Sequence, residues 1–235
     1  MAHLAPNNVM VIGVGGTGKS ILTYLKQSLI HATNQSMSTS SKSSLEPGYG
    51  ETIPENIRLL CLDADKESTN VDGVSLDYDE VAGNEFICVG NKSAQLRSFK
   101  DSLTSQASRQ RNKTLANPSY PWFEADDAEK LTILPDNQGA GVQRHYSRLC
   151  FLENESKSNK FSEKIKNAVA QFDKNGKKSY YVVVGSIAGG TGAGVIQDIM
   201  RFLRSITSVA SEVPAIFGIV VLSNAFRKQI EKQED

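Results

Sequence analysis

The sequence has few of the residues that mark secreted, metal-binding or membrane proteins. Its 235 residues include three cysteines, Cys61, Cys88 and Cys150, which are too few for a disulfide scaffold and are interpreted as reduced thiols. The three histidines are scattered, and no cysteine–histidine spacing suits zinc. No apolar run approaches the roughly 18–20 residues that cross a bilayer, and the N-terminus does not resemble a secretory signal. These absences predict a cytoplasmic protein without membrane insertion.

The chain also lacks an excess of charge of either sign. It has 26 Lys and Arg residues and 26 Asp and Glu residues, for a formal net charge of zero. This balance argues against a protein built to coat nucleic acid, and no nucleic-acid partner is expected. Apolar residues make up 39% of the sequence, which is enough for one sizeable core.

Short apolar runs alternate with segments of helical spacing. The expected strands are residues 8–12, 57–62, 86–89, 180–184 and 214–222, the last as a buried strand. The expected helices begin at Lys19 and after Gly194, and also cover residues 94–103, 143–153 and 160–172. Such alternation predicts an α/β fold, a three-layer sandwich with a mostly parallel, Rossmann-like sheet. Ligands of such sheets bind beyond the carboxyl ends of the strands.

Three segments depart from this regular order. Residues 33–56 are rich in serine and then in proline and glycine, which predicts a mobile loop. Residues 67–135 form an irregular insertion, and residues 227–235 form a polar tail. The expected domain therefore covers residues 1–226.

The first expected strand runs into a glycine cluster. Residues 13–20 read Gly-Val-Gly-Gly-Thr-Gly-Lys-Ser and match both the dinucleotide fingerprint and the phosphate-loop pattern. Glycines allow close backbone approach, and the N–H groups at a helix start attract phosphate oxygens. Lys19 would add a mobile positive charge, and Ser20 a hydroxyl for phosphate or magnesium. The candidate binding residues here are Gly13, Gly15, Gly16, Thr17, Gly18, Lys19 and Ser20.

Two further motifs help to distinguish between the dinucleotide fingerprint and the phosphate-loop pattern. Asp63 and Asp65 follow the second strand about 45 residues after Gly18, where the dinucleotide fold expects an acid after roughly 20. A second cluster, Gly-Gly-Thr-Gly-Ala-Gly at residues 189–194, follows a later strand. A partition-type ATPase with Lys19, Ser20 and Asp63 as its working residues remains an alternative, but it leaves this second cluster unexplained.

Four motifs in this order resemble the tubulin/FtsZ superfamily. They are Gly-Val-Gly-Gly-Thr-Gly-Lys from residue 13, Leu-Asp-Ala-Asp from residue 62, Gly-Ala-Gly from residue 139, and Gly-Gly-Thr-Gly-Ala-Gly from residue 189. The last is similar to the tubulin signature loop. Lys19 and Ser186 make the chain look closer to the bacterial and archaeal tubulin-like proteins than to FtsZ, the cell-division protein of this superfamily.

The resemblance implies a role for each motif. The first cluster would be the first phosphate loop, and the acidic motif would lie near the β- and γ-phosphates, with Asp63 or Asp65 holding Mg²⁺ through water. The third motif would sense the γ-phosphate, with Arg144 near it, and the second glycine cluster would wrap the α- and β-phosphates. The residues implied beyond the first cluster are Asp63, Ala64, Asp65, Gly139, Ala140, Gly141, Arg144, Ser186, Ala188, Gly189, Gly190, Thr191, Gly192, Ala193 and Gly194, with Ser223 and Asn224 near the ribose.

The resemblance further implies that the chain binds GTP or GDP with Mg²⁺ and self-associates head-to-tail into filaments. The central helix and the second domain of the family have no counterpart in the 235 residues, so the chain is expected to be an N-terminal half that hydrolyses GTP slowly or not at all alone. No catalytic residue is identified. A non-catalytic scaffold acting through Trp122 and Phe123 is the remaining alternative.

Overall fold

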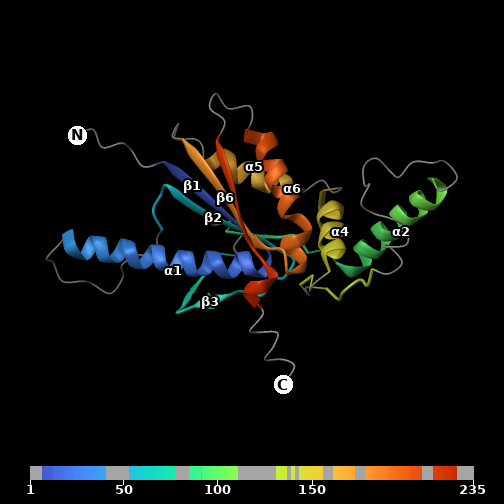
Figure 1. The fold of residues 1–235 in the computed structure, drawn as a ribbon, viewed down its shortest axis with the longest axis horizontal. Coiled ribbons are helices and arrows are strands. Elements are labelled where there is room, and N and C mark those ends of the chain that lie inside the picture. The colour runs from blue at the N-terminus through green and yellow to red at the C-terminus, as the bar shows by residue number, and fades with distance from the viewer. Residues whose placement is uncertain are drawn as a thin grey trace, which may run out of the picture.

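A parallel five-stranded sheet forms the centre of the protein (Figure 1). The computed structural model describes residues 7–40, 53–77, 85–90, 92–110, 131–136, 139–140, 143–155, 161–172, 178–207 and 214–226. The strands lie in the order β5-β2-β1-β6-β7, and every neighbouring pair is parallel. Their bounds are β1 Asn8–Val14, β2 Ile57–Asp63, β5 Phe86–Cys88, β6 Ser179–Ser186 and β7 Ala215–Val221.

Helices cover both faces of this sheet. Helix α1 (Gly15–Ser40) packs on one face, where Leu22 joins Leu59 and Val184 in a small core. Helices α4 (Arg144–Glu155), α5 (Phe161–Phe172) and α6 (Gly190–Thr207) cover the other face. Helix α2 (Ser93–Gln110) packs beside α4 at the end of this layer (Figure 1). Because side chains alternate along each strand, residues such as Met10 and Ile12 point into the second, larger core. The predicted three-layer α/β fold is confirmed.

Both helices that follow a glycine cluster begin earlier than expected. Helix α1 starts at Gly15 instead of Lys19, and α6 starts at Gly190 instead of after Gly194. The first N–H groups of a helix have no partner inside it, and in α1 and α6 mainly glycine and threonine residues carry them. The glycines therefore belong to the helix starts themselves.

Helix α1 also extends further than the expected loop at residues 33–56 allows. The segment is helical up to Ser40, and Thr33 Oγ1 donates a hydrogen bond to the Leu29 carbonyl one turn back. Serine and threonine are only moderately poor helix formers, and neither glycine nor proline occurs between Lys19 and Ser40. The loop prediction is therefore wrong for residues 33–40, while residues 41–52 lie outside the described part.

The insertion between β2 and α4 contains more regular structure than its sequence suggested. Strands β3 (Asn70–Val71) and β4 (Val74–Ser75) form an antiparallel hairpin. Its turn residues, Asp72 and Gly73, both have positive φ angles, of 50° and 84°. An Asp-Gly pair between short β-branched runs is a hairpin signal, so the sequence contained a signal for this turn. Trp122 and Phe123 lie outside the described residues.

Strand β7 is more exposed than the buried strand that was expected. It is the last strand of the sheet in the described residues, and Phe217 and Ile219 are 52% and 54% exposed. Their neighbours in register are Val182 and Val184 of β6, and Val184 is buried beneath α1. The cover of α1 thus ends at β6, so the prediction of a buried strand is wrong.

Among the described helices, none has the length and apolar character needed to cross a membrane.

Candidate functional site

A cavity of about 250 Å³ lies where β1, β2 and β6 end. Residues of both glycine clusters, the acidic motif and the third motif line it. These residues are Val14, Gly15, Gly16, Thr17, Asp63, Asp65, Gly139, Ala140, Ser186, Gly189, Gly190, Thr191 and Gly192. Motifs separated by up to 177 positions (192 − 15) in the sequence thus meet in one place, at the edge where parallel sheets bind their ligands.

The two glycine clusters contact each other in the wall of this cavity. Gly15 has a φ angle of +75°, and a Cβ atom at this position would lie 2.8 Å from the backbone nitrogen of Gly192. A Cβ atom on Gly192 would in turn collide with the carbonyl oxygen of Ser186. No larger residue fits at either position without movement of the backbone, so Gly15 allows the starts of α1 and α6 to meet, and Gly192 allows α6 to begin close to the end of β6.

The meeting of these helix starts makes the cavity suitable for an anion. Each helix N-terminus carries about half a positive elementary charge and a set of N–H groups without intrahelical partners. The starts of α1 and α6, at Gly15 and Gly190, both lie in the cavity lining. Two such termini directed at one cavity form an arrangement that binds phosphate groups.

The two aspartates of the acidic motif are held differently. Asp63 is buried; its Oδ1 accepts a hydrogen bond of 2.8 Å from the Ala64 N–H, and its Oδ2 lies 3.1 Å from Lys19 Nζ. Asp65 Oδ1 accepts a 2.9 Å hydrogen bond from the Glu67 N–H. Both side chains line the cavity, whereas Ala64 is buried in the larger core and is not among the lining residues.

Lys19 does not have the position that a phosphate-loop lysine needs. It is 4% exposed, and its Nζ donates hydrogen bonds to the carbonyl oxygens of Asp65, at 3.2 Å, and Glu67, at 2.8 Å. It also pairs with Asp63 and does not line the cavity. The ammonium group of Lys19, expected to be a mobile charge for phosphate, is therefore buried inside the protein. Ser20 likewise lies outside the lining and donates its hydroxyl hydrogen to the Gly16 carbonyl.

Several glycines of the motifs serve packing instead of lining the cavity. A Cβ atom on Gly13 would lie 2.7 Å from the Gly18 carbonyl oxygen, which shows how closely β1 and α1 approach each other. A Cβ atom on Gly194 would lie 2.7 Å from the Arg144 carbonyl oxygen, at the contact of α6 with α4. The structure therefore places Gly13, Gly18 and Gly194 outside the cavity lining.

Of the remaining candidate residues, some line the cavity and others do not. Ser186 lines it, accepts a hydrogen bond from the Ala188 N–H and donates one to the Val221 carbonyl. Arg144 donates to the Ile187 carbonyl at 3.3 Å and is not a lining residue. Four more positions complete the comparison: Ala188, Ala193, Ser223 and Asn224 are outside the lining, and the last two are exposed in a short 3-10 helix.

The third motif lies against the acidic motif. A Cβ atom on Gly139 would lie 3.2 Å from the Asp65 Cβ atom, and Ala140 is buried beside it. Gly141 lies outside the described residues. Val14 also lines the cavity; it was not among the expected residues, although its place between Gly13 and Gly15 of the first cluster was a signal.

The described protein groups do not form a metal site by themselves. Among the described residues, no three His, Cys, Asp or Glu side chains lie close enough together to hold a metal ion. Because both Asp63 carboxylate oxygens have partners within the protein, Asp65 is the better placed of the two acids. A magnesium ion would fit here if phosphate oxygens and water supplied its other ligands.

Comparison with known families agrees with this geometry. A search of curated proteins found no match. A family described as tubulin-like matches residues 10–235, a span that includes every residue lining the cavity. Since that match covers nearly the whole chain and the sheet has the parallel topology of such a domain, the chain belongs to the tubulin-like family.

Proposed function

We propose that this chain binds a guanine nucleotide through its phosphates and acts as a subunit of a nucleotide-dependent assembly. The observation that carries the proposal is the meeting of two glycine-rich helix starts at one cavity beyond the parallel strands. Membership in the tubulin-like family supports guanine as the base and self-association as the mode of assembly.

Each part of the cavity has a role in this proposal. The backbone N–H groups at residues 15–17 and 189–192 bind phosphate oxygens, and the hydroxyls of Thr17 and Thr191 add donors. Asp65 would hold a magnesium ion through water, and residues 139–140 close the cavity beside it. The base and ribose lie outside the described lining, toward Ser223 and Asn224.

The charge of the lining makes the proposal specific. It contains two aspartates and no lysine or arginine side chain among the described residues. Helix termini alone supply only partial charges, so a triphosphate needs a divalent cation here. We therefore expect nucleotide affinity to depend strongly on Mg²⁺.

Hydrolysis in this proposal depends on assembly. The chain positions the phosphates and a water molecule, and a neighbouring subunit in a head-to-tail contact completes the site. Stabilisation of the transferred phosphoryl group is mainly electrostatic and positional. GTP turnover by the isolated chain should accordingly be slow or absent, and steady GTP hydrolysis by the isolated chain would contradict this part of the proposal.

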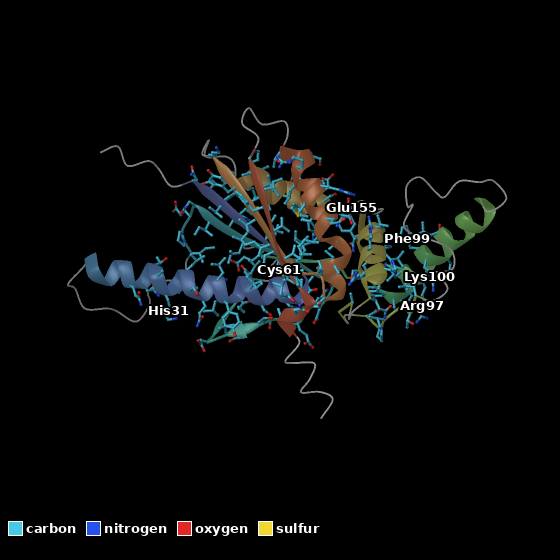
Figure 2. All side chains as sticks on the ribbon, viewed as in Figure 1. His31, Cys61, Arg97, Phe99, Lys100 and Glu155 are labelled. Carbon is cyan, nitrogen blue, oxygen red and sulfur yellow. The ribbon has the colours of Figure 1, made fainter. Side chains whose placement is uncertain are left out.

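The test is an equilibrium titration of the purified chain with GTP, GDP and ATP, each with and without Mg²⁺. A leucine in place of Gly189 is the blocking variant, because a Cβ atom there meets no atom within 4 Å and the side chain would extend from the cavity wall. His31→Leu is the matched control, since His31 is exposed on α1 and away from the site (Figure 2).

Guanine nucleotides should bind ahead of ATP, and Gly189→Leu should reduce affinity at least about 10-fold while His31→Leu does not. A preference for ATP with steady hydrolysis would instead support the partition-type ATPase. Absence of binding by the folded wild-type chain would refute the proposal and favour a scaffold.

A further inference from the structure

The ammonium group of Lys19 contacts three oxygens of a single loop. We propose that Lys19 is a positioning residue that holds residues 63–67, here called the acidic loop, and thereby places the Asp65 carboxylate at the phosphate-bound Mg²⁺. This inference rests on the nucleotide-binding function proposed above. It assigns Lys19 a role at the site without contact to the nucleotide.

The contacts of Lys19 saturate its donors. An ammonium group has three N–H donors, and Lys19 Nζ has three oxygen partners: Asp63 Oδ2 at 3.1 Å and the carbonyls of Asp65 and Glu67 at 3.2 and 2.8 Å. The ring of Phe86 lies on another side, with its centroid 6.0 Å from Nζ. Because Lys19 and Asp63 are both almost fully buried, water competes little for these interactions.

These contacts continue to the Asp65 side chain. Lys19 holds the carbonyls of Asp65 and Glu67, while the Glu67 N–H donates to Asp65 Oδ1. The result is a closed set of hydrogen bonds in which the lysine fixes the backbone and the backbone orients the carboxylate. Gly139 packs against the Asp65 Cβ atom from the other side. Partners of this kind behind a ligating carboxylate typically change metal affinity 10–100-fold.

Lys26 provides an internal comparison. It lies two turns after Lys19 on α1 and ties the same insertion to the helix, through the Ser75 carbonyl at 2.9 Å and Glu85 Oε2 at 2.7 Å. Neither of these partners lines the cavity. Replacing Lys26 therefore removes a similar clamp without touching the acidic loop.

The experiment measures GDP affinity with Mg²⁺ and with EDTA for the wild-type chain and for Lys19→Met, Lys26→Met and Asp65→Asn. In Lys19→Met, the gain in affinity that Mg²⁺ provides should fall at least about 10-fold, while affinity in EDTA stays within about 3-fold of the wild type. Asp65→Asn should lose the same gain, and the double variant Lys19→Met/Asp65→Asn should lose no more than either single variant. Lys26→Met should keep it.

Lys19→Met leaves the buried Asp63 carboxylate unpaired and could unfold the chain, so the double variant Lys19→Met/Asp63→Asn is measured as well. It removes both charges and should show the same loss of the Mg²⁺ effect. Retention of the Mg²⁺ effect in a folded Lys19 variant would overturn the inference. An equal loss of affinity with and without Mg²⁺ would also overturn it, because Lys19 would then contact the phosphates. Wild-type protein that binds no nucleotide would instead refute the proposed function, and this inference with it.

Discussion

Two adjacent glycines of the first cluster have different physical reasons for being glycine. Gly15 has a positive φ angle and touches the second cluster, whereas the nearest atom to a Cβ on Gly16 would be Asp63 Oδ2, at 3.9 Å. The first therefore serves the contact between α1 and α6, and the second leaves room at the cavity. The motif alone does not distinguish these roles.

Gly15→Ala should lower the free energy of unfolding by about 1–3 kcal/mol, because alanine is strained at this φ and its methyl group meets backbone. Gly16→Ala should change it by less than about 1 kcal/mol, since the added methyl group has space. Urea unfolding of both variants measures the difference. Equal losses would show that the two positions are not distinguished in this way.

The buried thiol of Cys61 provides a test at the same scale. Cys61 lies near the centre of the molecule (Figure 2), where burial first and the Asp63 charge second raise the pKa of its thiol well above the usual value of 9.0. In the unfolded chain the thiol ionises near that value, whereas in the folded protein it stays protonated. The contribution of the protonated Cys61 thiol to the free energy of unfolding is therefore complete below about pH 8.5 and is lost as the pH rises further.

We expect the free energy of unfolding to fall above that pH, with Cys61 contributing up to about 1.4 kcal/mol per pH unit. Cys61→Ala should lower stability at neutral pH but reduce this slope. Urea unfolding at about pH 7 and about pH 10 checks the prediction. If the free energy of unfolding of Cys61→Ala fell with pH as steeply as that of the wild type, the prediction would be wrong. The same slope is measured for Cys88→Ala as a comparison, because burial also raises the pKa of that thiol.

At the scale of elements, the main feature is the close approach of pairs of elements. Helix α6 passes α4 so closely that a Cβ atom on Gly194 would lie 2.7 Å from the Arg144 carbonyl oxygen and 2.9 Å from the Ser147 Cβ atom. The pair also carries the Arg148–Asp198 ion pair, with Nε and Oδ2 3.3 Å apart. The second glycine cluster therefore does two things, because its start lines the cavity and its end packs against a neighbouring helix.

Gly194→Ala should cost about 1–3 kcal/mol of stability, because the methyl group must push α4 and α6 apart. Gly189→Ala, five positions earlier, should cost less than about 1 kcal/mol, since nothing lies within 4 Å of its Cβ position. Thermal unfolding measures both. If Gly194→Ala were the milder of the two, the packing role assigned to Gly194 would be wrong.

For the whole molecule, the distribution of cover over the sheet is uneven. Both faces are packed from β2 to β6, while Phe217 and Ile219 of β7 are more than half exposed, as is Leu222 directly after the strand. Exposed apolar residues on a terminal strand favour association between chains. They contribute little to the core of the isolated chain.

Ile219→Thr should therefore change the free energy of unfolding by less than about 1 kcal/mol. Leu62→Ala, at a fully buried position of β2, should cost about 2–5 kcal/mol. Ile219→Thr should also lower light scattering by concentrated protein. A large loss of stability in Ile219→Thr would mean that this part of β7 is covered in solution.

Much of the fold follows from local sequence. Short apolar runs ending in glycine or aspartate predict β1, β2 and β6, and apolar residues at helical spacing predict α5 and α6, because both signals depend on neighbours in the chain. The position of the glycine clusters and the acidic motif after expected parallel strands likewise predicted that they would lie at one edge of the sheet. The ends of α1 and the exposure of β7 were not predicted, since they depend on which segments pack nearby.

The sequence by itself thus determined the strand-glycine-helix units, their parallel arrangement and the edge of the sheet where a ligand would bind. Only the tertiary structure decided which motif residues line the cavity. Lys19 is the clearest case: its spacing from Gly13 suits a phosphate contact, but two of its three partners lie 46 and 48 residues away in the sequence. A long cationic side chain adopts the position with the best set of acceptors, and those acceptors are brought together only by folding.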